Sequence, residues 1–121
     1  MSKKNLLAWI PFVLYCALIF YFSSQPEWPS PLQKFKASDK VLHFVEYGIL
    51  GFLWMLGVWR SRFRNSWVWI GGIFFILLFG ASDEWHQSFV VGREMALGDW
   101  VADSLGGIVG LFAAHLVPFG K

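Results

Sequence analysis

Four long apolar runs constrain this chain more than any other feature of its sequence. They cover residues 5–22, 40–59, 66–81 and 98–117. Each is close to the ~17–25 residues that a helix needs to cross a bilayer. The third run is the shortest, and it reaches full length only if its helix continues through the "SDEWHQ" that follows. Because a helix pairs its backbone polar groups internally, as hydrocarbon requires, the runs predict four transmembrane helices.

Composition argues against a soluble domain of the same length. Apolar residues make up 56% of the 121 residues, and charged residues only 15%. A soluble domain of this size needs polar side chains over most of its surface, and this chain could not supply them. Basic residues stand in small groups near the ends of the apolar runs, without the basic stripe of a nucleic-acid-binding protein. We therefore expect a lipid bilayer, and no nucleic acid, as a partner.

The first run follows two lysines, as the apolar region of a signal peptide would. It is longer than the usual ~7–15 residues of such a region, and the "SSQPEWPS" after it lacks an A-x-A cleavage site. We interpret it as a retained helix. Pro11 is tolerable within a membrane helix and predicts a kink there.

The fold class that follows is an all-α bundle of four transmembrane helices, forming a single domain over residues 1–121. The positive-inside rule favours cytoplasmic termini, because that orientation places six basic residues inside and four outside. The inner group is Lys3, Lys4, Arg60, Arg62, Arg64 and Lys121, and the outer group is Lys34, Lys36, Lys40 and Arg93. The arginine cluster in the short "RSRFRN" loop is the stronger part of this preference.

Polar residues converge on the outer side of such a bundle. In an up-down arrangement, the start of the second span, the end of the third and the start of the fourth share that side. The residues found there are His43, Glu46, Asp83, Glu84, Gln87, Arg93, Asp99 and Asp103. Because ionisable residues inside a membrane helix cost up to ~2.5–3.5 kcal/mol, chance placement is unlikely and a shared site is expected.

Helical spacing places several of these residues on common faces. The pairs three or four residues apart are His43 with Glu46, Asp83 with Gln87, and Asp99 with Asp103. The face of the last pair continues to Gly106 and Gly110, a small-xxx-small spacing that lets another helix approach closely. The acids have few basic neighbours, so a bound divalent cation or shared protons would relieve their repulsion.

Each candidate has a functional and a purely structural interpretation. His43 and Glu46 form either a metal-ligand or acid–base pair, or ordinary hydrogen bonds between helices. Asp99 either joins the site or caps the fourth helix. Arg93 either clamps a phosphate or carboxylate or forms a salt bridge to a nearby acid. The "DEWHQ" residues are either ligands or bases, or a solvated helix end.

Three stretches also carry a family resemblance: "DKVLHFVEYGILGFL", "GASDEWHQSFVVGR" and "LGDWVADSLGGIVG". Together they resemble the VanZ-like family of small bacterial membrane proteins. The resemblance implies a multi-pass protein of the bacterial cytoplasmic membrane and a link to teicoplanin-type glycopeptide resistance, the activity of the family's namesake. The family's typical motif residues fall on the same eight polar positions, but no settled chemistry comes with them.

Two functions remain open from the sequence. The first is a cell-envelope protein that binds an external lipid-linked or glycopeptide-like ligand, with Gln87, Arg93 and Asp99 as ligand-binding residues. The second is a membrane-embedded enzyme acting on a lipid phosphate. Its catalytic candidates are His43, Glu46, Asp83, Glu84 and Asp103, and its metal-ligand candidates are His43, Glu46, Asp83 and Asp103. The chain lacks a clear nucleophile, which favours the binding protein. Its oligomeric state is not predicted.

Overall fold

The computed structural model describes residues 3–28, 39–61, 65–93 and 95–117, and all regular structure in those residues is helical. The helices are α1 (Lys3–Ala8), α2 (Ile10–Ser23), α4 (Asp39–Ser61), α5 (Trp67–Gln87) and α6 (Leu97–His115). With α1 and α2 counted as one span, four segments are long and apolar enough to cross a membrane. The chain is thus an all-α, multi-pass membrane protein, as the sequence predicts. The orientation prediction draws partly on Lys34, Lys36, Arg62, Arg64 and Lys121, which lie outside the described residues.

The first span is interrupted at Trp9, between α1 and α2. Pro11 is in the first turn of α2 and has no backbone N–H to bond back to the preceding turn. The Trp9 N–H instead bonds the Leu6 carbonyl at 3.2 Å, a tighter turn than that of an α-helix. The kink expected from Pro11 is therefore present as a short break two residues earlier.

The third span is longer than the apolar run that predicted it. Helix α5 continues through "SDEWHQ" to Gln87, six residues beyond the apolar run, which is the continuation that the sequence requires for a full-length span. Its 21 residues extend over about 30 Å, the thickness of a bilayer core. The helix continues because Asp83, Glu84 and Gln87 turn into the bundle and are buried there, and Tyr47 on α4 donates a hydrogen bond to Asp83.

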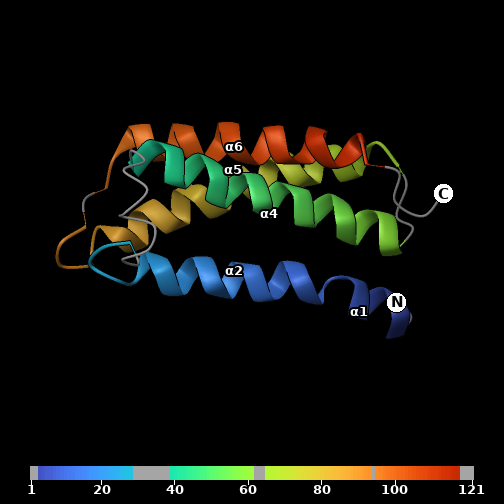
Figure 1. The fold of residues 1–121 in the computed structure, drawn as a ribbon, viewed down its shortest axis with the longest axis horizontal. Helices are drawn as coiled ribbons and strands as arrows, with labels where there is room; N and C mark the ends of the chain where they lie inside the picture. The colour runs from blue at the N-terminus through green and yellow to red at the C-terminus, as the bar shows by residue number, and fades with distance from the viewer. Residues whose placement is uncertain (1–2, 29–38, 62–64, 94, 118–121) are drawn as a thin grey trace.

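Helices α4 and α6 pack more closely than any other pair (Figure 1). A Cβ atom on Gly106 would lie 2.1 Å from the Phe44 carbonyl oxygen, and one on Gly110 would lie 2.0 Å from the Gly48 oxygen. Only glycine allows the two backbones to approach this far. The predicted close-packing face is therefore confirmed, and it brings the polar starts of both helices together.

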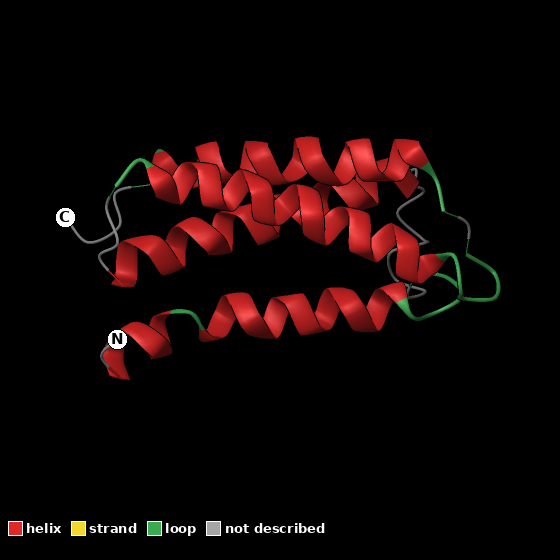
Figure 2. Cartoon of the chain, turned by 180° about the vertical axis from the view of Figure 1, so that it is seen from behind, coloured by secondary structure: helices red, strands yellow, loops and turns green. Residues whose placement is uncertain are grey.

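The bundle buries a narrow apolar core and leaves large side chains on its outside. Tyr47, Leu50, Ile76 and Leu111 are almost fully buried between the helices. Many other aromatic and aliphatic side chains are exposed along the spans, where lipid would cover them. The helices alternate in direction, so the end of α2, the start of α4, the end of α5 and the start of α6 share one end of the bundle (Figures 1 and 2).

Candidate functional site

That shared end holds the buried polar residues of the bundle. The side chains of seven predicted site residues are there and are buried: His43, Glu46, Asp83, Glu84, Gln87, Asp99 and Asp103. Neither Glu46 nor Asp103 faces lipid, since their exposed fractions are 8% and 0%. The three spans that the sequence places together therefore do converge.

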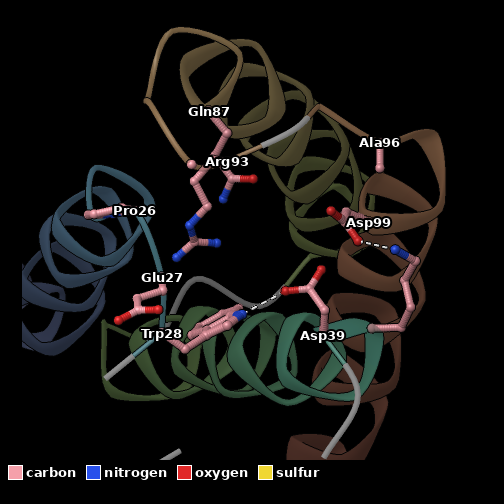
Figure 3. A pocket seen from close by; sticks show the side chains of 10 residues that line it. Pro26, Glu27, Trp28, Asp39, Gln87, Arg93, Ala96 and Asp99 are labelled. Atoms are coloured by element: carbon pink, nitrogen blue, oxygen red, sulfur yellow. Dashed lines mark hydrogen bonds and ion pairs between the residues drawn. The ribbon is translucent and has the colours of Figure 1, made fainter. Parts of the chain in front are cut away.

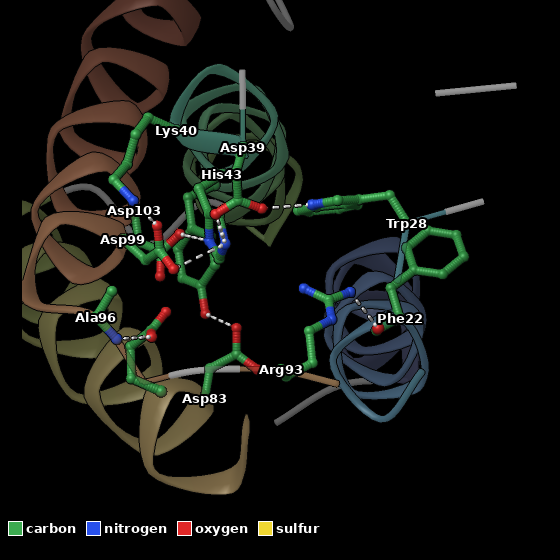
Figure 4. A network of polar contacts seen from close by, with 12 residues as sticks. Phe22, Trp28, Asp39, Lys40, His43, Asp83, Arg93, Ala96, Asp99 and Asp103 are labelled. Atoms are coloured by element: carbon green, nitrogen blue, oxygen red, sulfur yellow. Dashed lines mark hydrogen bonds and ion pairs between the residues drawn. The ribbon is translucent and has the colours of Figure 1, made fainter. Parts of the chain in front are cut away.

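His43 is at the centre of the cluster, and both it and Asp103 are fully buried. Its Nδ1 lies 2.7 Å from Asp103 Oδ1, across the close contact between α4 and α6 (Figure 4). If Asp103 is ionised, its oxygen can only accept, and Nδ1 is then the donor of this bond. For His43, the structural interpretation of a hydrogen bond between helices is therefore present, because the imidazole bonds across to α6.

The second nitrogen of His43 faces two further carboxylates. Nε2 lies 3.5 Å from Asp39 Oδ2 and 3.7 Å from Asp99 Oδ2. The other oxygen of each acid is occupied: Asp39 Oδ1 accepts a bond from the Trp28 indole at 2.6 Å, and Asp99 Oδ1 pairs with the Lys40 ammonium. Asp99 is not the cap of the fourth helix, because Ala96 occupies that position and Asp99 lies within the first turn.

The acids of α5 form a second part of the cluster, with contacts to α4 and to the start of α6. The Tyr47 hydroxyl donates to Asp83 Oδ2 at 3.1 Å, and Glu84 Oε2 accepts from the Ala96 backbone N–H at 3.2 Å. The remaining oxygens Glu84 Oε1 and Asp103 Oδ2 are buried without a hydrogen-bond partner in the described part of the chain. Buried carboxylate oxygens of this kind need a proton, a water molecule or a cation.

Glu46 occupies the helix face beside these acids. Its side chain is buried, and the Tyr15 hydroxyl donates to its backbone carbonyl at 2.9 Å, joining α2 to α4. Two groups of three residues offer ligand atoms within 4.8 Å of one another: Asp39, His43 and Asp99, and His43, Glu84 and Asp103. Glu46 and Asp83, both expected as metal ligands, belong to neither group.

A pocket of about 480 Å³ lies above the cluster, at the end of the bundle (Figure 3). Its walls carry Trp28, Asp39, Gln87, Arg93 and Asp99, with Lys40 beside them. The pocket therefore exposes part of the polar cluster to the surface, and it draws residues from all four spans or the loops next to them.

Arg93 enters this pocket from the loop after α5 (Figure 3). Gly92 before it has φ of 92°, which favours glycine, in a turn closed by the Arg93 N–H and the Val90 carbonyl at 3.1 Å. The Arg93 guanidinium donates to the carbonyls of Gln25 (2.8 Å) and Phe22 (3.0 Å), and it lies 5.1 Å from the centre of the Trp28 ring. Its bonds thus anchor the loop to the end of α2, and the predicted salt bridge to an acid does not describe them.

The "DEWHQ" segment splits between two environments. Asp83, Glu84 and Gln87 point into the bundle and are buried, so of the two interpretations the solvated helix end does not apply to them. Trp85 is 65% exposed. His86 turns toward α2, where it stacks on Phe20 at 4.4 Å and lies 3.3 Å from the Ser24 hydroxyl.

Three residues of the cluster are not among the site residues predicted from the sequence: Asp39, Lys40 and Tyr47. The predicted second span began at residue 40, so Asp39 fell outside it. The signal that could have found the acid and the tyrosine is helical spacing. Asp39 and Tyr47 are four residues before and after His43, on the same face of α4.

Comparison with known proteins gives a family and nothing finer. A family model described as VanZ/LLP1 matches residues 2–118, nearly the whole chain. No curated protein and no solved structure matches it.

Proposed function

The chain belongs to the VanZ/LLP1 family, and from this premise we propose that it is a cell-envelope protein that binds the phosphorylated headgroup of a lipid-linked ligand. In this proposal it resides in the bacterial cytoplasmic membrane with both termini inside. The pocket above the polar cluster then opens on the outer surface, at the level of the lipid headgroups.

The composition of the pocket is the observation that carries this proposal. Its walls combine a guanidinium, an ammonium, an amide and carboxylates within a volume of about 480 Å³. Binding pockets for small molecules have volumes of about 300–1,000 Å³ and a few convergent polar groups. The cations can take phosphate oxygens, and the carboxylates can accept bonds from hydroxyl groups.

A second cavity beside the cluster suits the lipid part of such a ligand. It has a volume of about 270 Å³ and lies between α2 and α5, against Phe20, Phe79 and Phe89. Asp83 and His86 form its polar side. A chain anchored in the bilayer could lie along this aromatic surface while its headgroup reaches the pocket.

The size of the pocket favours a lipid-linked headgroup over a glycopeptide. A glycopeptide antibiotic is several times larger than the pocket and could only rest on its rim. The link to teicoplanin-type resistance therefore stays a prediction from the family resemblance, and here it would follow from binding a lipid-linked envelope component.

Farnesyl phosphate, with farnesol as its uncharged counterpart, tests the proposal. We expect the protein in phosphatidylcholine nanodiscs to bind the phosphate and not the alcohol in calorimetric titrations. Arg93→Gln removes a charged donor, a loss of about 1.5–3 kcal/mol, so affinity should fall roughly 10–100-fold. Equal affinities for the phosphate and the alcohol would contradict phosphate recognition.

Arg60→Gln is the matched control, because Arg60 lies in the last turn of α4, at the opposite end of the bundle. It should leave farnesyl phosphate affinity unchanged. Arg93 also anchors its loop to two carbonyls, so Arg93→Lys is measured in parallel to separate charge from loop structure. Recovery of most of the affinity by lysine supports a direct role of the charge, whereas equal losses in Arg60→Gln and Arg93→Gln refute the proposed site.

A membrane enzyme acting on a lipid phosphate is the second candidate, and one observation favours it. The unpartnered oxygens of Glu84 and Asp103 lie beside His43, which is the arrangement of groups that hold and move protons. Release of inorganic phosphate from farnesyl phosphate by the parent protein, abolished in Glu84→Gln, would support the enzyme. Binding without turnover would leave the binding protein as the better description.

A further inference from the structure

We propose that Asp39, His43 and Asp99 bind a divalent metal ion at the wall of the pocket above the polar cluster, where the lipid headgroup is proposed to bind. Zn²⁺ matches this set of ligands best. The ligand atoms are His43 Nε2 and the Oδ2 atoms of the two aspartates. The inference deepens the proposed function, because a phosphate oxygen of the headgroup could complete the coordination of the metal.

The distances between these three atoms suit a bridging ion better than direct hydrogen bonds. His43 Nε2 lies 3.5 Å and 3.7 Å from the two carboxylate oxygens, whereas an N–H···O bond spans about 2.7–3.2 Å. Ligands about 2.1 Å from a tetrahedral zinc ion are about 3.4 Å apart. Ligand atoms of the three residues also lie within 4.8 Å of one another, so rearrangement of the two carboxylates could bring them around one ion.

The buried imidazole supplies an independent reason to expect a ligand. His43 is fully buried, and its Nε2 has no hydrogen-bond partner in the described part of the chain. In the proposed metal-bound form, Nδ1 donates to Asp103 and the deprotonated Nε2 turns its lone pair toward Asp39 and Asp99. A buried nitrogen directed at two carboxylates is suited to bind a metal ion, because one ion would give the nitrogen and both carboxylate oxygens a bonding partner.

Each ligand is also held by a second interaction on its other polar atom. Asp103 orients the imidazole, Trp28 holds Asp39 Oδ1, and Lys40 pairs with Asp99 Oδ1 (Figure 4). Carboxylate–histidine–metal arrangements of this kind fix the tautomer and direction of the ligating nitrogen. The three ligand atoms are thus directed toward one point from two helices.

The residues around the proposed metal site supply negative charge, and the pocket gives an ion a route to it. Glu84 and Asp103 lie beside His43, opposite the half-exposed Asp39. Asp39 and Asp99 also line the pocket, so an ion can enter and a water molecule or phosphate can reach it. The alternative group of His43, Glu84 and Asp103 is less suitable, because its imidazole nitrogen nearest Asp103 already carries a hydrogen bond.

The donor set indicates the kind of metal. One imidazole nitrogen with carboxylate oxygens suits zinc and related transition metals, whereas Mg²⁺ and Ca²⁺ prefer oxygen ligands alone. Three protein ligands with an open fourth position are typical of zinc sites that also bind water or substrate. We therefore expect Zn²⁺ and Co²⁺ to bind far more tightly than Mg²⁺.

Metal titration of the purified protein tests this inference without any phosphorylated lipid. Protein in an uncharged detergent is stripped with EDTA, dialysed, and titrated with Zn²⁺ or Co²⁺. We expect about one Zn²⁺ per chain by elemental mass spectrometry and the intense visible absorption of four-coordinate Co²⁺. Absence of bound zinc, or the weak spectrum of six-coordinate Co²⁺, would overturn the proposed site.

Substitutions of the proposed ligands test whether these residues bind the ion. His43→Ala should abolish stoichiometric binding, and Asp39→Asn, a change at a half-exposed residue in the first turn of α4, should weaken it without disturbing the core. Asp103→Asn removes the charge behind the imidazole and should weaken binding about 10–100-fold. His115→Ala removes a histidine from the other end of the bundle and should change nothing. Binding that survives in both His43→Ala and Asp39→Asn refutes the assignment.

The two proposals fail in distinguishable ways. Stoichiometric zinc binding without any farnesyl phosphate binding would refute the headgroup proposal and leave the metal site intact. Farnesyl phosphate binding that EDTA does not change, in a protein that binds no zinc, would refute the metal site alone.

Discussion

Gly106→Ala offers the sharpest test of how the fold forms the polar cluster. Gly106 lies one turn below Asp103 on α6, and its added Cβ would be 2.1 Å from the Phe44 carbonyl oxygen on α4. Phe44 is the neighbour of His43, so the clash occurs directly beneath the His43–Asp103 bond. The obstacle is backbone, which cannot turn aside as a flexible side chain can.

The structure gives the size of the effect. To reach the 3.4 Å of an ordinary contact, the helices must separate by about 1.3 Å at this point. A rigid separation of that size would stretch the His43–Asp103 distance from 2.7 Å well beyond hydrogen-bonding range. Overpacking costs about 1–3 kcal/mol and a broken buried pair about 3–5 kcal/mol, so we expect a loss of at least roughly 3 kcal/mol.

Unfolding in detergent micelles, followed by circular dichroism, measures this loss. Gly71→Ala is the matched control, because its Cβ meets only the Trp54 ring, at an ordinary 3.5 Å. It should be neutral or stabilising by up to ~1 kcal/mol, since alanine favours helix over glycine. The double variant Gly106→Ala with Asp103→Asn should lose less unfolding free energy than the two single variants added together. Both single variants break the same His43–Asp103 bond, and the double variant can lose it only once. Equal stability of the two alanine variants would refute the account of the helix contact.

Three further predictions follow from the same geometry. Tyr47→Phe removes the donor to Asp83 and should lower the free energy of unfolding by about 1–3 kcal/mol, and a change within error would show that another donor satisfies Asp83. Asp103→Asn and Glu46→Gln should insert at normal membrane levels on immunoblots, because neutral residues insert more easily, and Asp103→Asn, which removes the charge behind His43, should also weaken farnesyl phosphate binding. Unchanged binding in Asp103→Asn would make the His43–Asp103 bond purely structural. Ser88→Cys should react with an impermeant maleimide on whole cells, and labelling only after lysis would reverse the orientation.

The sequence predicts the spans well because the bilayer imposes one length scale on them. Four apolar runs near 20 residues identify the helices, and the glycine spacing on residues 106 and 110 identifies the contact between α4 and α6. The sequence leaves the end of α5 open between the apolar run and the polar residues after it. Hydropathy decreases at Asp83 although the helix continues, and only tertiary contacts distinguish a buried polar turn from a solvated helix end.

The sequence predicts which residues belong to the polar cluster better than it predicts which of them bond to each other. Sequence spacing identifies neighbours on one helix, so it favours His43 with Glu46, whereas the close contact with α6 offers His43 a nearer partner in Asp103. The same limitation applies to Arg93. Its partners are the carbonyls at the end of α2, about 70 residues away in sequence, and backbone acceptors leave no signature in a sequence.

The glycine contact and the buried acids depend on each other. An aspartate inside a membrane span is costly unless a partner stabilises it, and the Asp103 side chain is fully buried. The glycines on α6 bring α4 close enough for His43 to provide that partner at 2.7 Å. Once Nδ1 is used in this way, Nε2 must point toward the pocket, because the two ring nitrogens lie on different sides of the imidazole. The packing that makes a deep aspartate tolerable therefore also directs a nitrogen of His43 at Asp39 and Asp99, the two acids that line the pocket.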